Sequence, residues 1–337
     1  MQDDSTDQDL GALSRRGLFG FALTAASVVP LAAGAQAPAP PTAPVARPSL
    51  PQGGRGPLKV LFITKYHEFD RENLFLMLDK MGQEITWTHI EHPAAIEFYD
   101  PKLAAPYDVL LFYDCYAGRV FTPTSTPGGR QTFVDEVPSK EVQENFAKLL
   151  RKGDKGFVFL HHAISSWAHS WPAGVNGSNA YSEVVGGAAD WTTPLKNVRG
   201  IDYPRSGYAE DVPISVIVED PNHPVTKGVD LSFDIIDENY LCPMFEDSVH
   251  CLTRSTKIPR AEDFRPAQAG HPVGSSMTSW VKTAERSPVV YIQHGHSNHA
   301  FTNDNFYKLV LNAIRWSASA EAKTWAHDNA KRIFRND

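Results

Sequence analysis

The sequence predicts an α/β fold whose central sheet is mostly parallel and is covered by helices. Two observations support this class. Several apolar runs of strand length are continuous, as in YDVLLFYD at 107–114, and continuous apolar strands are typical of sheets that are buried on both faces. Amphipathic segments with helical spacing lie between these runs in the order β-α-β-β-α-β, which is the pattern of a layered α/β domain.

The first half of the folded region supplies six expected elements. They are strand 58–64, helix 71–83, strand 84–90, strand 107–114, helix 139–153 and strand 156–162. The second helix has the clearest ends, because Ser139 can cap its N-terminus and Lys152-Gly153 can end it. No glycine-rich dinucleotide motif follows the first strand and the chain contains no Walker loop, so neither nucleotide-binding motif is present.

The second half adds three strands and a closing helix. These are expected at 212–220, 232–240, 287–294 and 303–319. The predicted α/β domain spans residues 57–318, and residues 319–337 are interpreted as a C-terminal surface helix. A domain of this size can bury a substantial core, since 42% of the 337 residues are hydrophobic.

Residues 1–37 are interpreted as a signal peptide of the twin-arginine type. Arg15-Arg16 precedes a short, alanine-rich apolar stretch and then small residues near Ala35. The alternative, a membrane anchor, is disfavoured because Pro30 interrupts the apolar run. Residues 38–56 are rich in proline and glycine and are predicted to be a linker. We therefore expect a periplasmic or secreted protein without stable membrane insertion after signal removal.

Composition excludes some classes of partner and site. The formal net charge is -7 and no basic cluster occurs beyond Arg15-Arg16, so a nucleic-acid surface is not expected. The chain has three cysteines and no CxxC pair, which disfavours a thiolate zinc site. An oxidising compartment would permit a disulfide between Cys242 and Cys251, although their spacing alone does not establish one.

Polar, titratable side chains follow the strong apolar strands at their carboxyl ends. In an open parallel sheet these ends meet at one edge, where ligands bind. The side chains that this topology gathers are His67 and Glu68, Asp114 to Tyr116, His161 and His162, Asp237 to Tyr240, and His294, His296, Asn298 and His299. The sequence therefore predicts one polar, histidine-rich site at this edge of the sheet.

Five short motifs, taken in order, resemble those of the ThuA-like family, which is named for trehalose utilisation. They are GFVFLHHA with its glycine-apolar-histidine strand, VEDPNHPVTKGV with HP-[IV]-T-x-G, the acidic DENY, the GH turn of YIQHGHSNHAF, and the closing helix FYKLVLNAIRW. The resemblance implies a flavodoxin-like, three-layer fold similar to class I glutamine amidotransferases, with a mostly parallel central sheet. It also implies a carbohydrate as the substrate class.

The chain departs from these patterns at two places. Gly186-Gly187 matches a family motif, but the His-Pro that often follows it is missing, so no substrate contacts are assigned there. His161-His162 stands at the turn after the fourth strand, where an amidotransferase carries its nucleophilic cysteine. Glutaminase chemistry through a thioester needs a thiolate at that turn, and it is therefore rejected.

Four residues are predicted to be catalytic: His161, His296, Asp237 and Glu238. His161 matches the family's strand-end histidine and His296 matches its GH turn. Asp237 or Glu238 could act as an acid/base or could orient one of the imidazoles. The structural alternatives are buried histidines bonded to the backbone and an acidic loop cap packed over Tyr240.

Substrate contacts are predicted for His67, Trp167, Tyr240, His294 and Asn298. Trp167, with Trp171 and Trp191, could form a stacking platform for a sugar, or could simply pack within its loop. A divalent metal is a candidate cofactor, and its candidate ligands are His161, Glu183, His294 and His296. The spacing permits this metal without demanding it, because no HExxH signature occurs.

These observations predict an exported enzyme that acts on a small carbohydrate. We expect a hydrolase or lyase of a sugar or keto-glycoside, because proton removal next to a carbonyl needs a base that is poised near neutrality. Two alternatives stay open. One is a non-catalytic periplasmic carbohydrate-binding protein, in which the tryptophans matter and the histidines do not. The other is a metal-dependent hydrolase of another substrate.

Overall fold

The computed structural model describes most of the chain from residue 50 onwards. The described residues are 50–116, 119–122, 132–135, 137–168, 170–190, 195–196, 200, 202–203, 205–264 and 271–335. The predicted signal peptide (1–37) and most of the predicted linker lie outside them. Within the described residues, none of the helices has the length and apolar character that a bilayer crossing requires.

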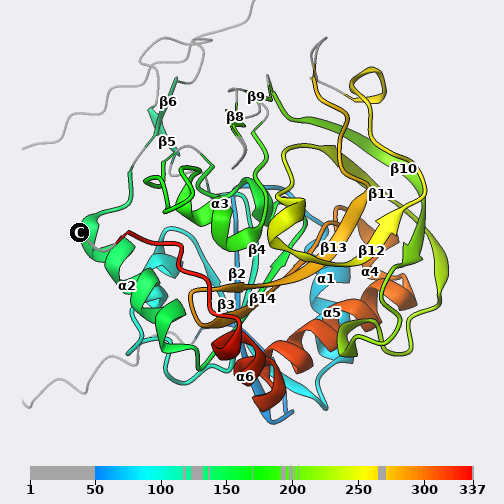
Figure 1. Cartoon of the computed structure of the whole chain (residues 1–337). Coiled ribbons are helices and arrows are strands. Elements are labelled where there is room, and N and C mark those ends of the chain that lie inside the picture. The colour runs from blue at the N-terminus through cyan, green and yellow to red at the C-terminus, as the bar shows by residue number, and fades with distance from the viewer. Residues whose placement is uncertain are drawn as a thin grey trace, which may run out of the picture. The chain divides into compact units, whose positions relative to one another are not determined.

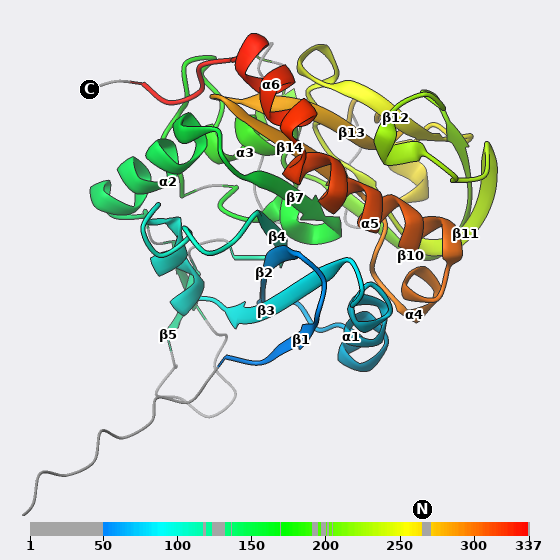
Figure 2. The ribbon, with the colours of Figure 1, turned by 90° about the horizontal axis from the view of Figure 1, so that it is seen from below.

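A ten-stranded sheet organises the domain, in the order β1-β3-β2-β4-β7-β14-β13-β12-β10-β11. Its centre consists of five parallel strands (Figures 1 and 2). They are β3 (Ile85–Glu91), β2 (Leu58–Lys65), β4 (Val109–Asp114), β7 (Gly156–Leu160) and β14 (Ser287–Ile292). The predicted α/β class with parallel central strands is thereby confirmed.

Antiparallel strands extend the sheet on both sides of this parallel centre. They are β1 (Gln52–Gly54) on one edge, and β13 (Met277–Ala284), β12 (His250–Ser255), β10 (Gly207–Val218) and β11 (Ser232–Leu241) on the other. Two short ribbons stand apart from the sheet: β5 (Arg119–Thr122) with β6 (Thr132–Asp135), and β8 (Leu195–Lys196) with β9 (Asp202–Tyr203).

Helices cover both faces of the sheet and produce two hydrophobic clusters, because side chains of the central strands alternate between the faces. Val60 and Phe62 of β2 pack with α1 and α5, whereas Leu61 and Ile63 pack with α2 and α3. The α-helices are α1 (Arg71–Lys80), α2 (Lys140–Lys152), α3 (Ala180–Val185), α4 (Asn298–Phe301), α5 (Asp304–Ala318) and α6 (Ala320–Asp328). Short 3-10 helices are η1 (Ala94–Tyr99), η2 (His161–Ser165), η3 (Pro224–Thr226), η4 (Glu246–Ser248) and η5 (Ala261–Asp263).

The long helices begin and end where their capping residues predict. Ser139 accepts a hydrogen bond from the backbone N–H of Val142 at the start of α2, and Gly153 ends this helix in the left-handed conformation. Asn303 caps α5 in the same way, and Ser319 caps α6. The helix expected within 139–153 is therefore confirmed as α2. The helix expected at 303–319 is α5, whose bounds agree to within one residue at each end.

The structure differs from the sequence predictions in several places. The C-terminal helix expected at 319–337 is shorter, because α6 ends at Asp328 and the described residues after it are not helical. The linker expected to reach residue 56 ends earlier, because Gln52–Gly54 pairs with β3 as strand β1. The strands β12 and β13 were not predicted; their mixed polar and apolar residues lack a clear period. Cys242 and Cys251 are free thiols, so the disulfide that the sequence permits is not formed.

Candidate active site

Three predicted residues come together at the carboxyl edge of the parallel strands: His161, Glu238 and His296. His161 follows β7, Glu238 lies in β11 and His296 follows β14. The Nε2 atom of His161 lies 3.0 Å from Oε2 of Glu238 and 3.2 Å from Nδ1 of His296. The same Oε2 atom lies 3.2 Å from Nδ1 of His296, which closes a triangle of polar atoms. We call these residues the His-Glu-His triad.

The backbone fixes which nitrogen of His161 faces the triad. Its Nδ1 atom lies 2.7 Å from the carbonyl oxygen of Gln293 and donates to it, so Nε2 carries the lone pair in the neutral imidazole. The hydroxyl of Tyr240 lies 2.9 Å from this Nε2 atom. His161 itself has a left-handed backbone with φ 49°, and such strain in a residue with a Cβ atom is concentrated at functional sites.

Asp237 holds the loop that carries His296. Its two carboxylate oxygens accept hydrogen bonds from the backbone N–H groups of Gly295 (2.6 Å) and His296 (2.9 Å). Gly295 has φ 129°, which favours glycine, and its carbonyl accepts a hydrogen bond of 2.6 Å from Tyr113. Asp237 therefore positions the loop through its backbone, and both of its carboxylate oxygens are used in doing so.

The charges of the site are unevenly divided. Burial tends to raise the pKa of Glu238, but its bonds with His161 and His296 outweigh this and hold the pKa below its usual range. The bond with Glu238 raises the pKa of His296. In contrast, burial first and the neighbouring imidazoles second lower the pKa of both His67 and His162. At neutral pH the site thus combines an ionised carboxylate with two neutral histidines.

A cleft of about 480 Å³ adjoins the triad through His67. The ring of His67 stacks on that of His162 at 4.5 Å and meets the ring of His296 edge-on at 5.4 Å between centroids. The cleft is lined by Thr64, Lys65, Tyr66, His67, Glu68, Phe69, Arg71 and Glu91. Its lining includes charged residues of both signs beside aromatic rings, which suits a polar ligand with an apolar face.

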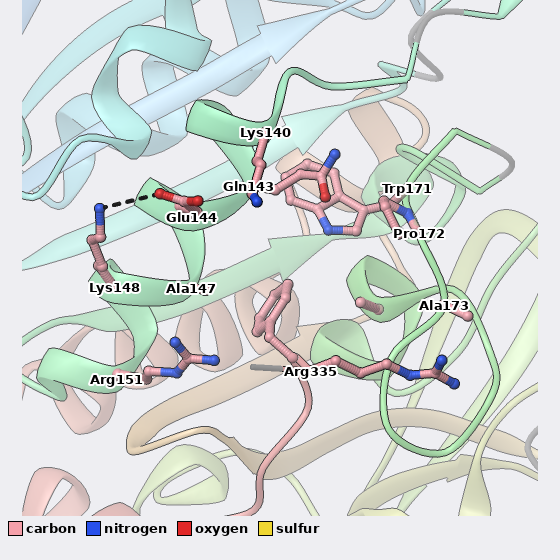
Figure 3. Close-up of a pocket in the computed structure, with 12 residues that line it drawn as sticks. Lys140, Gln143, Glu144, Ala147, Lys148, Arg151, Trp171, Pro172, Ala173 and Arg335 are labelled. Carbon is pink, nitrogen blue, oxygen red and sulfur yellow. Dashed lines mark ion pairs between the residues drawn. The ribbon is translucent and has the colours of Figure 1, made fainter. Parts of the chain in front are cut away.

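A larger cavity of about 680 Å³ lies elsewhere, between α2 and the C-terminal segment (Figure 3). Figure 3 shows Lys140, Lys148, Arg151 and Arg335 around it, with Trp171 on one side. Its lining contains no histidine and only one carboxylate, Glu144, which pairs with Lys148 at 3.7 Å. None of the four predicted catalytic residues lines either cavity, but His67, which lines the smaller cleft, is in ring contact with His296.

Two of the remaining predicted residues lie beside the triad. Tyr240 is buried and its hydroxyl touches His161. His294 is also buried, and its Nδ1 atom lies 3.5 Å from Oδ2 of Asp237. Asn298 and the neighbouring His299 lie at the start of α4, and both are exposed. Tyr240 thus lies against the triad, while both ring nitrogens of the buried His294 lack a hydrogen-bond partner among the described residues.

The structure corrects the predicted roles of Trp167 and Glu183. Trp167 is 1% exposed and packs edge-on against Tyr116 and Trp171, so it cannot present a ring face to a sugar. Trp191, the third tryptophan of the expected platform, lies outside the described residues. Glu183 of α3 is held instead by Asn176, whose Nδ2 atom lies 3.2 Å from its carboxylate. The carboxylate that joins the two histidines is that of Glu238.

The sequence analysis did not identify Gln293 and Tyr291, whose hydrogen bonds hold the segments that carry the triad. The side chain of Gln293 donates to Asn239 at 2.8 Å, which ties the end of β14 to β11. The hydroxyl of Tyr291 donates to the backbone carbonyl of His161 at 3.0 Å. Gln293 is a buried amide at the end of an apolar strand, and this burial pattern is the signal by which it could have been found.

Among the described residues, His161, Glu238 and His296 form the one group of at least three His, Cys, Asp or Glu side chains whose ligand atoms converge closely enough to hold a metal ion. Two imidazole nitrogens and a carboxylate oxygen form a donor set that suits zinc, manganese or iron. The same atoms can share a proton when no ion is present. The arrangement can therefore support acid-base chemistry, metal binding, or both.

Comparisons with known proteins give one family match and several structural similarities. The family model described as "ThuA: Trehalose utilisation" matches residues 59–317. A ThuA-like protein from Parabacteroides merdae has a similar structure, with a TM-score of 0.53 and 15% identity over 78% of this chain and 90% of that chain. A second ThuA-like protein, from Bacteroides uniformis, gives a TM-score of 0.48 with 17% identity over 80% and 94% of the two chains. A GMP synthase protein from Thermoplasma acidophilum gives 0.39 with 8% identity over 77% and 92%. No curated protein sequence matches this chain.

Proposed function

The chain belongs to the ThuA family of trehalose utilisation, and on this premise we propose that it is an enzyme acting on a carbohydrate. The family supports a carbohydrate-related role. The finer proposal is a hydrolase or lyase of a sugar or keto-glycoside, with histidine and carboxylate groups in the chemistry. The observation that carries it is the convergence of His161, Glu238 and His296 within 3.2 Å of one another beside an open cleft.

The cleft offers a base in a suitable state. The Nδ1 atom of His67 lies 2.6 Å from the backbone carbonyl of Glu68 and donates to it, so its Nε2 atom carries a lone pair. Burial lowers the pKa of His67, which keeps the imidazole neutral at pH 7. A neutral imidazole beside the triad can accept the proton from a carbon next to a carbonyl, while His296, whose pKa Glu238 raises, can donate a hydrogen bond to the carbonyl oxygen.

In a lyase reaction the bonds would balance as follows. His67 takes the proton, the electron pair of that C–H bond forms a carbon–carbon double bond, and the glycosidic C–O bond on the next carbon breaks. The leaving oxygen then takes up this proton from His67, which returns to its neutral state. In a hydrolase reaction water supplies both the oxygen and the proton instead. Either path uses the same parts of this chain: a base in the cleft, a polar contact for the carbonyl and the open cleft beside them.

The test is turnover of a panel of glycosides and their 3-keto derivatives. We expect His296→Ala and Glu238→Gln to lower kcat/KM at least 100-fold. His250→Ala is the matched control, because His250 also pairs with a carboxylate, Asp220 at 2.8 Å, but lies on the surface. Full turnover by both triad variants, or no turnover of any sugar by the wild type, would contradict the proposal.

The alternative of a non-catalytic sugar-binding protein has less support. It depended on an exposed tryptophan platform, and Trp167 and Trp171 are both buried. The cleft that remains is lined by Tyr66, His67 and Phe69 in place of tryptophan. A binding protein would retain its affinity for sugars in the variant His296→Ala and would show no turnover, which separates it from the proposed enzyme.

We also propose export through the twin-arginine route. The support is the sequence alone: Arg15-Arg16 before a short apolar run and small residues near Ala35. The protein should be recovered from the periplasm or medium with an N-terminus near Gln36. Replacing both arginines by lysine should retain it in the cytoplasm with its N-terminus uncut. Equal export of this variant would contradict the twin-arginine route.

A further inference from the structure

We propose that the His-Glu-His triad binds one divalent first-row transition-metal ion. The ligand atoms are Nε2 of His161, Nδ1 of His296 and Oε2 of Glu238, which lie 3.0 to 3.2 Å apart. Ligands at about 2.1 Å from one ion lie about 3.0 Å apart in octahedral geometry and about 3.4 Å apart in tetrahedral geometry. The triangle therefore has the size of one face of a metal coordination sphere.

The protons available to the triad favour a cation. Nε2 of His161 carries a lone pair because its other nitrogen donates to Gln293. The carboxylate oxygen of Glu238 can only accept when it is ionised. Two protons, on Nδ1 of His296 and on the hydroxyl of Tyr240, thus lie among three electron-rich atoms, two of which belong to side chains with at most 6% exposure. A divalent ion at the centre would satisfy all three atoms at once.

The surrounding residues orient the ligands as in known metal sites. Metal-binding histidines usually donate their second ring N–H to a carboxylate or a backbone carbonyl, and His161 donates to the carbonyl of Gln293. Asp237 fixes the loop that carries His296 by accepting hydrogen bonds from the backbone N–H groups of Gly295 and His296. Asp237 and Glu238 together carry two negative charges beside the site, which offsets the charge of a divalent ion.

The triad leaves coordination positions open towards the cleft. The side chains of His161 and Glu238 are buried, whereas that of His296 is 23% exposed and faces His67 of the cleft. Three protein ligands on one face leave one further position in a tetrahedral ion and three in an octahedral ion. Water, or two oxygens of a keto-sugar, could occupy them. Imidazole donors favour zinc, manganese, iron, cobalt or nickel over magnesium and calcium.

The inference deepens the proposed function and rests on it for its catalytic meaning, but the binding of the ion rests on geometry alone. A bound ion would polarise the carbonyl oxygen of a keto-sugar and acidify the C–H bond next to it. The triad histidines would then be ligands, and the acid-base work would pass to His67 and to water on the ion. This division of roles explains why several histidines share one site.

The experiment measures metal binding without turnover. The full chain is stripped with EDTA and titrated with Zn²⁺ and, separately, with Mn²⁺ by calorimetry, and the metal content of untreated protein is measured by mass spectrometry. We expect one equivalent bound, and at least 100-fold weaker binding in His296→Ala and in Glu238→Gln. His250→Ala, which removes a surface histidine paired with Asp220, should bind as the wild type does.

Thermal unfolding distinguishes the loss of metal binding from misfolding of the variant. His296 lies in a half-buried loop, so His296→Ala should fold, and without metal it should melt within a few degrees of the stripped wild type. Added Zn²⁺ should raise the melting temperature of the wild type and not that of the variant. Failure of the wild type to bind either ion more tightly than millimolar would overturn the inference, as would equal binding by His296→Ala.

The two proposals can fail separately. Sugar turnover by a wild type that binds neither ion more tightly than millimolar would refute the metal site and leave the proposed function intact. Tight metal binding by a protein that transforms no glycoside or keto-glycoside would refute the proposed function and leave the metal site intact.

Discussion

Asp237→Asn should be among the most damaging single-atom changes in the site. The carboxylate is 1% exposed and accepts two backbone hydrogen bonds, at 2.6 Å from Gly295 and 2.9 Å from His296. Hydrogen bonds to a charged group contribute about 1.5–3 kcal/mol each, and a buried donor left without a partner costs about 1–3 kcal/mol. Asparagine keeps one acceptor oxygen and turns an N–H₂ group towards the other donor. We therefore expect a loss of about 3 kcal/mol in the free energy of unfolding.

Urea unfolding followed by circular dichroism measures this loss. With a denaturant dependence of about 3 kcal/mol/M, the midpoint should fall by about 1 M. Asp234→Asn is the matched control: it lies in the same strand, is exposed, and accepts a 2.6 Å bond from the side chain of Ser215. It should shift the midpoint by less than about 0.2 M. Equal midpoints for both variants would refute the positioning role of Asp237.

Three further predictions concern the glycine of the loop and two buried bases. Gly295→Ala should destabilise the fold by about 1–3 kcal/mol in urea, because φ is 129° and a Cβ atom would lie 3.3 Å from Phe306. Burial lowers the pKa of His89 to about 4. Between pH 6.5 and 4 the unfolded chain binds the extra proton, so His89 should lower the free energy of unfolding by up to about 3 kcal/mol as the pH falls through that window. His89→Gln should remove this share of the loss and leave the shares of His67, His162 and His223, whose pKa values are also lowered by burial. Burial lowers the pKa of Lys282 to about 7. The unfolded chain keeps the proton of this lysine up to pH 10.5, so the free energy of unfolding should rise by up to about 3 kcal/mol from pH 7 to 9. Lys282→Met should remove the rise.

The position of the site could be predicted from the sequence because it depends on topology. Parallel strands place their carboxyl ends at one edge, so His161 and His296, which follow two neighbouring parallel strands, had to lie near each other. Glu238 could be placed in the same region because it follows an apolar run. What the sequence could not show is that β11 brings Glu238 across to β7, since this depends on an antiparallel pairing with β10.

The misassigned residues share a physical cause. Spacing along the chain does not show which face of an element is covered, and both Trp167 and Glu183 lie in elements that pack against the α2 side of the sheet. Trp167 fills the core beside Tyr99 and Trp171. Glu183 lies against Gly174, whose missing side chain leaves room for the carboxylate. The strands β12 and β13 escaped prediction for a related reason, because they are buried by packing and not by a clear apolar pattern.

The turn after β7 carries an imidazole and no thiol, which limits the chemistry available at this edge of the sheet. An acyl-transfer mechanism through a thioester needs a thiolate at this turn, and the residue there is His161. Burial raises the pKa of Cys242 to about 12 and that of Cys251 to about 11, so both thiols are protonated at neutral pH. Cys115 lies 3.0 Å from the hydroxyl of Ser165, a group that cannot act as its base. The residue in the strained turn is an imidazole whose Nε2 atom lies 3.0 Å from Glu238 and 3.2 Å from His296, and the proposed proton or cation site depends on this arrangement.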